Sequence, residues 1–392
     1  MKLPRKQCIF QGAHGIIPPA GDQTYAQSIP QIPAATERMK QVIGLLLALC
    51  GAATVLAEDH AVVLIYHHVS ETTPALTSTT PESFDSHLDY LENNDFTVWP
   101  LARILSTLAA GQPLPANTVA ITFDDAYESV YSEAFPRLRE RNWPFTLFVS
   151  SEGIDRGYSS YLSWAQLREL ADAGVELGNH SHSHAHLVRR LPKESDAQWK
   201  KRITTDIKTA ALRLKLETGS SSRLFAYPYG EYSPELKKIV GELGYYGIAQ
   251  QAGAIGRVSD FLALPRFPMA QAYADLERFK IRVNSRPLPV SSVVIKGNDH
   301  KSYRPLEKLH LTLADGDYRA ARLACYRASG GRLETQVTKD HPLTLSITIT
   351  GAQDAGRHKI NCTAPAKTSD NVFFWYSFQW LVKHEDGSWY RE

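Results

Sequence analysis

The chain has 392 residues, of which 43% are hydrophobic and 21% are charged, and its formal net charge is +2. This length allows two domains and a sizeable core. The near-neutral charge excludes a strongly basic nucleic-acid-binding surface, and no basic run indicates attachment to a membrane surface.

The N-terminal residues have the pattern of a targeting segment rather than of a domain. Residues 1–38 show no apolar periodicity, and we interpret them as a disordered upstream over-extension, with the true start at Met39. A basic start, an apolar run over residues 42–53 and small residues after it predict a secretory signal peptide at 39–57. We therefore expect an exported protein, periplasmic or extracellular. A lipoprotein anchored at Cys50 is the alternative, and the apolar run is too short for a stable membrane span.

Strand and helix patterns alternate over residues 59–280, which we predict to be the main domain. Short apolar runs predict seven strands, at 61–66, 96–99, 118–122, 145–149, 175–178, 223–227 and 246–249. Helical periodicity lies between them, at about 82–94, 101–110, 129–142, 163–173, 196–217 and 233–244. Strands separated by helices pair in parallel, so the pattern predicts an α/β fold, either a βα barrel or an open sheet. In both, functional residues gather at the C-terminal ends of the strands.

The remaining residues predict a second, smaller domain. Residues 281–308 contain three prolines and indicate a linker or an irregular bridging strand. Period-two alternation over residues 309–392 predicts an all-β accessory domain of sandwich type. Cys325 and Cys362 form one even pair there, and we expect a disulfide in an oxidising compartment. The aromatic residues of the predicted strand 372–382 either belong to the core or form a glycan-binding platform.

Two adjacent carboxylates follow the third predicted strand. Asp124 and Asp125 lie between the apolar run 118–122 and a helical pattern. At the end of a strand, one carboxylate can face a metal ion while the other faces a water molecule. The alternative is a helix N-cap followed by a first-turn acid, since both positions are favourable near the helix dipole.

A histidine-rich segment follows the fifth predicted strand. His180 and His184, together with one carboxylate, make an N,N,O set with room for a water, which is the ligand count of a catalytic zinc site. The alternative is a solvated histidine-rich loop, because His182 and His186 make the pair less distinctive. The two motifs at corresponding strand ends together predict a metal site.

Two other strand ends carry polar or turn-forming residues. His67 and His68 follow the first predicted strand, and Pro228-Tyr229-Gly230 follow the sixth. Four separate strand ends therefore converge on one rim of the predicted fold. This convergence indicates a functional site more strongly than any single motif.

These segments resemble the polysaccharide deacetylases, carbohydrate esterase family 4, over about residues 60–268. The first and last matching segments are similar to the exopolysaccharide branch, which includes the poly-β-1,6-N-acetylglucosamine deacetylases. The matching segments are Tyr66-His67-His68-Val69, Thr122-Phe123-Asp124-Asp125, His180-Ser181-His182-Ser183-His184, Phe225-Ala226-Tyr227-Pro228-Tyr229-Gly230 and Leu264-Pro265-Arg266.

The resemblance implies a distorted (β/α)7 barrel of the polysaccharide-deacetylase type. It also implies that Asp125, His180 and His184 hold a divalent metal ion and that Asp124 is the general base. A metal on two neutral imidazoles and one carboxylate keeps a net positive charge, which lowers the pKa of a bound water.

The other implied roles belong to the first and sixth strand ends. Tyr229 would donate its backbone N–H to the oxyanion, and His67 would be the general acid, with His68 as its competitor. The chain departs from the family at Ala226, where many members have an arginine that pairs with the catalytic base. We expect Arg266 to orient the base instead; the alternative is that Arg266 is a surface residue.

We therefore predict a secreted metal-dependent hydrolase that removes N-acetyl groups from an N-acetylated amino-sugar polysaccharide, resembling poly-N-acetylglucosamine, and releases acetate. Zinc is the expected ion, and the same ligands accept cobalt or nickel. The expected partner is the glycan polymer, with no nucleic acid and no stable membrane span; the oligomeric state stays open. Peptidoglycan, chitin oligomers and O-acetyl esters are alternative substrates, and a non-catalytic glycan-binding or scaffold protein is the alternative of another class.

Overall fold

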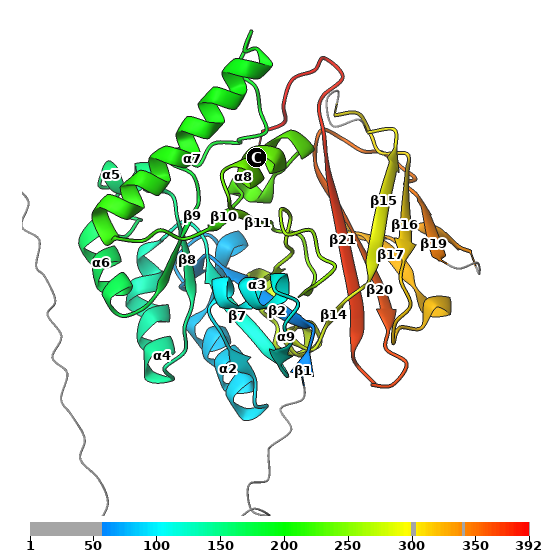
Figure 1. Ribbon diagram of the computed structural model, residues 1–392, viewed down its shortest axis with the longest axis horizontal. Helices are drawn as coiled ribbons and strands as arrows, with labels where there is room; N and C mark the ends of the chain where they lie inside the picture. The colour runs from blue at the N-terminus through cyan, green and yellow to red at the C-terminus, as the bar shows by residue number, and fades with distance from the viewer. Residues whose placement is uncertain (1–56, 299–302, 339–341, 392) are drawn as a thin grey trace, which may run out of the picture. The chain divides into compact units, whose positions relative to one another are not determined.

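A curled sheet organises residues 60–268 (Figure 1). The computed structural model describes residues 57–298, 303–338 and 342–391. The main path of the sheet runs β11, β10, β9, β8, β7, β2 and β12, with β5 paired to β7 and β13 paired to β2. The predicted strands are β2 (His60–Tyr66), β5 (Thr97–Val98), β7 (Thr118–Phe123), β8 (Thr146–Val149), β9 (Glu176–Asn179), β10 (Leu224–Ala226) and β11 (Tyr246–Ile248). These seven pair in parallel, which confirms the α/β prediction.

A short segment joins the two ends of the parallel path. The backbone N–H of Leu264 donates to the carbonyl oxygen of Gly247 on β11 at 2.9 Å. Three residues later, β13 (Phe267–Pro268) runs parallel to β2. The segment therefore closes the curled sheet into the distorted barrel that we expected, and Arg266 lies between its two contacts.

Helices connect the strands, and all six predicted helices are present. Figure 1 shows α7 beside α6 and near β9, and α7 packs against both of these elements. The predicted helices are α2 (Pro81–Asn93), α3 (Leu101–Ala109), the π-helical turn η2 (Val130–Ala134) continuing into α4 (Phe135–Glu140), α6 (Trp164–Asp172), α7 (Asp196–Thr218) and α8 (Pro234–Glu242). Helices that we did not predict are α5 (Ser151–Asp155), α9 (Leu276–Val283) and the 3-10 turns η1 (Ala75–Thr77), η3 (Pro228–Gly230), η4 (Gln271–Ala274) and η5 (Ala320–Arg322).

The helix starts follow from local capping chemistry. Ser163 and Ser195 each accept a hydrogen bond from the backbone three residues later, where a glutamine side chain bonds back to the cap. These reciprocal capping boxes satisfy backbone N–H groups that otherwise lack partners in the first turn. At its other end, α7 stops at Gly219, whose φ of 75° suits a residue without a Cβ.

The C-terminal residues form two four-stranded sheets packed around their own apolar cluster. Alternate leucines and isoleucines of β16 and β19 are buried in this cluster, as period-two alternation predicts. The first sheet is β14 (Arg286–Pro287), β21 (Phe373–Val382), β20 (Gly356–Pro365) and β17 (Ala324–Arg327). The second is β15 (Val290–Lys296), β16 (Lys308–Leu313), β19 (Leu343–Thr348) and β18 (Glu334–Val337). The sandwich-like prediction is confirmed.

The region predicted as a linker, residues 281–308, contains regular structure. α9 extends to Val283, β14 pairs with β21 in parallel, and β15 pairs with β16 along most of its length. The bridging strand that we considered corresponds to β14. Residues 290–296 therefore belong to the sandwich rather than to a linker. The nearby prolines are compatible with these strands because they lie at strand ends, where no ladder hydrogen bond is lost.

Both faces of β21 are covered. Phe374 and Trp380 belong to the sandwich core. Trp375, on the opposite face, packs edge-on against Phe267 of β13 with ring centroids 5.2 Å apart. The aromatic residues of this strand therefore pack in two cores, which favours the core interpretation over a glycan-binding platform.

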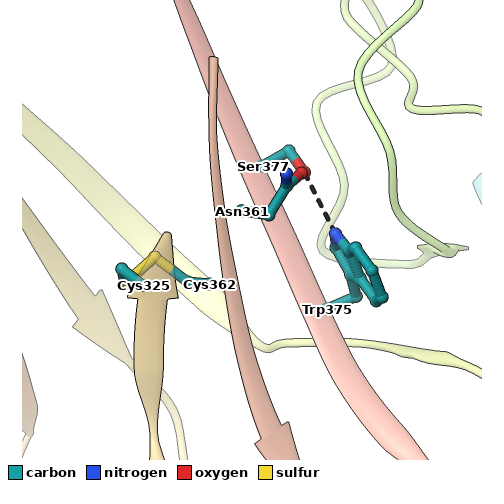
Figure 2. The surroundings of a disulfide bond; sticks show 5 residues. All are labelled: Cys325, Asn361, Cys362, Trp375 and Ser377. Carbon is teal, nitrogen blue, oxygen red and sulfur yellow. Dashed lines mark hydrogen bonds between the residues drawn. A yellow bond between two sulfur atoms is a disulfide. The ribbon is translucent and has the colours of Figure 1, made fainter. Parts of the chain in front are cut away.

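The disulfide between Cys325 and Cys362 is present, and it joins directly paired residues of β17 and β20. Figure 2 shows this bond with Asn361, Ser377 and Trp375 grouped to its side. Trp375 Nε1 donates to Ser377 Oγ at 3.2 Å, and Ser377 Oγ lies 2.7 Å from Asn361 Oδ1. Neighbouring residues of β20 point to opposite faces of the sheet. Cys362 therefore lies inside the sandwich, whereas Asn361 lies on the other face beside Ser377.

Three short pairings complete the described strands: β1 (Ala57–Glu58) with β6 (Leu114–Pro115), β3 (His68–Val69) with β4 (Ser78–Thr79), and β12 (Ile255–Gly256) with β2. Apart from Ala57, the predicted signal peptide and the residues before it lie outside the described residues. Among the described residues, no helix has the length and apolar character needed to cross a bilayer.

Candidate active site

The predicted site residues meet at the C-terminal ends of the barrel strands. Asp124 and Asp125 follow β7, His180 follows β9, and Tyr229 lies in η3 just after β10. His67 follows β2, the neighbour of β7 in the sheet. Parallel strands bring these ends to one rim, although the residues are up to about 160 positions apart in sequence.

The three predicted metal ligands face one another. Asp125 Oδ1 lies 3.3 Å from His180 Nε2 and 3.0 Å from His184 Nε2. One ligand atom from each residue lies within 4.8 Å of the other two. Burial alone would raise the pKa of Asp125, but the influence of the two adjacent histidines outweighs burial and holds the pKa well below the usual range.

This arrangement fits a divalent ion. Asp125 Oδ1 is buried and makes no hydrogen bond of good geometry with any described residue. His180 Nδ1 lies 2.8 Å from the carbonyl oxygen of Ala226. Because a carbonyl can only accept, Nδ1 carries the proton, and the lone pair of Nε2 is directed at Asp125. Two imidazole nitrogens and one carboxylate oxygen are ligands that zinc, cobalt and nickel accept.

Backbone strain is concentrated at this site. Positive φ is uncommon outside glycine and persists where the surroundings enforce it, often at functional sites. The site residues and neighbours with positive φ are Asp125 (74°), Ala126 (64°), Ser181 (66°), His184 (51°) and Tyr229 (57°). One hydrogen bond that helps to hold this backbone conformation runs from the backbone N–H of His184 to Ser181 Oγ, at 3.0 Å.

Asp124 is paired with Arg266 in a fully buried, two-pronged ion pair. Arg266 Nη1 lies 2.7 Å from Oδ1 of Asp124, and Nη2 lies 2.7 Å from Oδ2; both side chains are 0% exposed. Arg266 also donates to Thr122 Oγ1 and to the carbonyl oxygen of Ala249. Burial acts to raise the pKa of Asp124, but the Arg266 charge and neighbouring histidines lower it overall. Arg266 is therefore not a surface residue, and its guanidinium pairs with the carboxylate that we predicted it to orient.

The two candidate acids have different surroundings. Gln250 Nε2 lies 3.5 Å from His67 Nε2 and 3.4 Å from Asp124 Oδ2, so His67 and Asp124 share a neighbour. His68 instead stacks on the ring of Tyr127, with centroids 3.8 Å apart. Burial, aided by the charge of His67, lowers the pKa of His68 to about 4. Burial also lowers the pKa of His67, while the carboxylates of Asp124 and Asp125 act in the opposite direction.

Three residues beside the site were not predicted from the sequence. Gln250 lies two positions after the end of β11, so the strand-end rule that found the other residues could have found it. Glu231 directly follows the Pro228–Gly230 turn and is 1% exposed. Tyr127 lies two positions after Asp125, and nothing in the sequence indicates that its ring covers His68.

Comparison with known proteins finds sequence similarity to polysaccharide deacetylases. Residues 111–248 match the family described as polysaccharide deacetylase. The chain is 27% identical over 218 residues to the poly-beta-1,6-N-acetyl-D-glucosamine N-deacetylase of Escherichia coli (strain K12), covering 46% of this chain and 32% of that protein. It is 27% identical over 197 residues to the protein of the same name from Staphylococcus epidermidis, covering 48% of this chain and 67% of that protein. The chain thus spans about a third of the length of the Escherichia coli relative.

A solved structure shares the fold. The Streptococcus pyogenes deacetylase PplD in complex with acetate superposes with a TM-score of 0.52 at 20% sequence identity. The superposition covers 57% of this chain and 98% of that one. The shared fold therefore accounts for only part of this chain.

Proposed function

We propose that this chain, whose residues 111–248 match the polysaccharide deacetylase family, is a metal-dependent hydrolase that removes N-acetyl groups from an N-acetylated amino-sugar polymer. The observation that carries this proposal is the meeting of Asp125, His180 and His184 beside the paired Asp124. The named activity of the Escherichia coli and Staphylococcus epidermidis relatives supports a poly-β-1,6-N-acetylglucosamine as the substrate. The predicted signal peptide supports export.

Asp125, His180 and His184 would hold the ion, with zinc as our first choice. When bound, a divalent ion would lower the pKa of a water ligand and polarise the acetamide carbonyl. The hydrogen bond from His180 Nδ1 to Ala226 keeps the imidazole in the tautomer that can ligate.

Asp124 would accept the proton of the attacking water. Its two oxygens are held by Arg266, but each carboxylate oxygen has a second lone pair for a further hydrogen bond. Arg266 keeps the carboxyl group ionised and fixes its orientation, which are the two properties that a general base needs.

Two groups would act on the acetamide itself. The backbone N–H of Tyr229 would stabilise the oxyanion, and losing such a donor typically costs about 10²–10³ in rate. His67 would protonate the departing amine, which is a poor leaving group until it is protonated. Its place directly after β2, the neighbour of β7, supports this role over His68, which is stacked on Tyr127.

Acetate release from defined oligomers tests the proposal. The purified chain is incubated with poly-β-1,6-N-acetylglucosamine oligomers, chitin oligomers, peptidoglycan and an O-acetyl ester, with and without a chelator. We expect the β-1,6-linked oligomers to release most acetate and the chelator to stop the release. No acetate from any N-acetylated polymer would contradict the proposed activity, and a preference for another polymer would replace the substrate.

A further inference from the structure

The turn that carries Tyr229 is held by the C-terminal sandwich as well as by the barrel. Gln379 on β21 donates from Nε2 to the carbonyl oxygen of Gly230 at 2.7 Å. Gln379 is only 3% exposed, so water does not readily replace this bond. Removing the donor would leave a buried carbonyl without its partner, immediately after the proposed oxyanion donor.

A second contact comes from the C-terminal segment. The hydroxyl of Tyr390 donates to Glu231 Oε1, and His186 Nδ1 lies 2.9 Å from Glu231 Oε2. Arg189 donates to the backbone carbonyl of Tyr390 at 3.0 Å and lies over its ring. Glu231 is 1% exposed, so this buried carboxylate ties the end of the turn to the C-terminal segment.

The same network reaches the ring of Tyr229. The imidazole of His186 stacks on this ring with centroids 3.9 Å apart and planes 10° apart. The ring of the metal-ligand candidate His184 lies 4.7 Å from it on centroids. Tyr390 contacts Glu231, Glu231 orients His186, and His186 packs against Tyr229. Tyr390 is therefore connected to the ring of Tyr229 through Glu231 and His186.

The turn has little room to relax if these bonds are lost. Gly230 has a φ of 67°, and a Cβ built there would lie 2.5 Å from Cβ of Gln250 and 2.9 Å from Nη1 of Arg357 on β20. The backbone therefore packs closely between the barrel and the sandwich. Tyr229 itself has a positive φ of 57°, a conformation that persists only where the surroundings over-determine it.

We infer that Gln379 and Tyr390 are positioning residues, and that the C-terminal β region keeps the N–H of Tyr229 directed at the developing oxyanion. The inference rests on the proposed function, because it concerns the same site. It gives the sandwich a part in turnover, through the turn Pro228–Gly230, rather than a part in holding glycan.

Two conservative substitutions in the full chain test this inference. Gln379→Met removes the donor at similar volume, and Tyr390→Phe removes one hydroxyl. We expect each to lower kcat for acetate release about tenfold to hundredfold, because displacing a positioned group by about 1 Å can cost about 10²-fold. KM and metal content should stay close to wild type. Gln336→Met on β18 and Tyr326→Phe on β17, both at exposed positions, are the matched controls and should keep the wild-type kcat.

The outcomes separate positioning from a structural role. Wild-type kcat in both variants overturns the inference, as does a rise in KM alone or a lower Tm with kcat unchanged. If Gln379→Met does not fold, Tyr390→Phe decides, since it deletes a single oxygen. A wild-type chain that releases no acetate would contradict the proposed function instead, so the two failures are distinguishable.

Discussion

The surroundings of Asp124 and Asp125, the two adjacent carboxylates at the end of β7, differ in the hydrogen-bond partners that the protein offers to the carboxylate oxygens. Asp124 is matched atom for atom by Arg266, with two hydrogen bonds of 2.7 Å in a fully buried setting. Asp125 Oδ1 faces two imidazole nitrogens at 3.0 and 3.3 Å and makes no hydrogen bond of good geometry with a described residue. Asp125 and His184 also have positive φ.

The difference indicates a division of labour between neighbouring residues. A buried charge needs a partner, and Asp124 has its partner in the chain. The surroundings of Asp125 are instead those of a ligand, with nitrogen lone pairs converging on the same small volume as its oxygen. Substitutions at these positions should therefore fail in different ways.

The largest effect is expected for Asp125→Ala. Removing the carboxylate ligand should abolish stoichiometric metal binding and reduce acetate release to background, because the remaining two histidines form an incomplete site. Metal analysis alongside turnover checks this. Asp172→Ala, on the exposed end of α6, is the control and should behave as wild type.

Asp124→Asn should separate turnover from metal binding. The amide keeps the shape of the side chain but cannot accept a proton, so kcat should fall about 10²–10⁴-fold, the usual contribution of a general base. Metal content should be unchanged. A wild-type kcat in this variant would show that Asp124 is not the base.

Substitution of the two adjacent histidines should sharpen the assignment of the acid. His67→Gln should lower kcat by about 10²-fold or more, since it removes the proposed proton donor. His68→Gln should have the smaller effect, because His68 stacks on Tyr127 and its low pKa keeps it neutral near pH 7. The reverse order of the two effects would transfer the role to His68.

Arg266→Lys should have the smallest effect on turnover among the substitutions at the proposed catalytic and metal-binding residues and the arginine that orients them. A lysine keeps the charge beside Asp124 but cannot make the two-pronged contact, so the carboxylate loses orientation. We expect kcat to fall less than in Asp124→Asn, and the free energy of unfolding to drop by about 1–3 kcal/mol through unpaired buried groups. Arg168→Lys, in a half-exposed pair with Glu217, should change neither quantity appreciably. An unchanged kcat in Arg266→Lys would show that the two-pronged ion pair between Arg266 and Asp124 does not contribute to turnover.

Much of this site could be predicted because parallel strands obey simple rules. The apolar runs located the strands, and the strand-end rule then placed Asp125, His180 and Tyr229 on one rim without any knowledge of distances. Arg266 could only be suggested, since its side chain crosses the barrel to a partner 142 positions away. Gln250 also lies just after a strand end, but an uncharged amide at such a position does not by itself indicate a functional residue.

The C-terminal region was harder to predict, for physical reasons. Prolines at 287 and 289 suggested a linker, but they sit at the ends of β14 and before β15, where the missing N–H is tolerated. Alternation along β21 showed that its two faces differ, yet period two cannot tell which face meets solvent. The contacts of Gln379 with Gly230 and of Tyr390 with Glu231 depend on tertiary packing, which local patterns do not encode.

Metal stoichiometry in three proteins tests the central claim most directly. The wild type, Asp124→Asn and Asp125→Ala are stripped with chelator, reloaded with zinc, freed of excess metal and analysed for bound zinc per chain. The account predicts one ion per chain in the wild type and in Asp124→Asn, and none in Asp125→Ala, with acetate release returning on reloading only in the wild type. Equal zinc in all three proteins, or full activity in the stripped wild type, would contradict it.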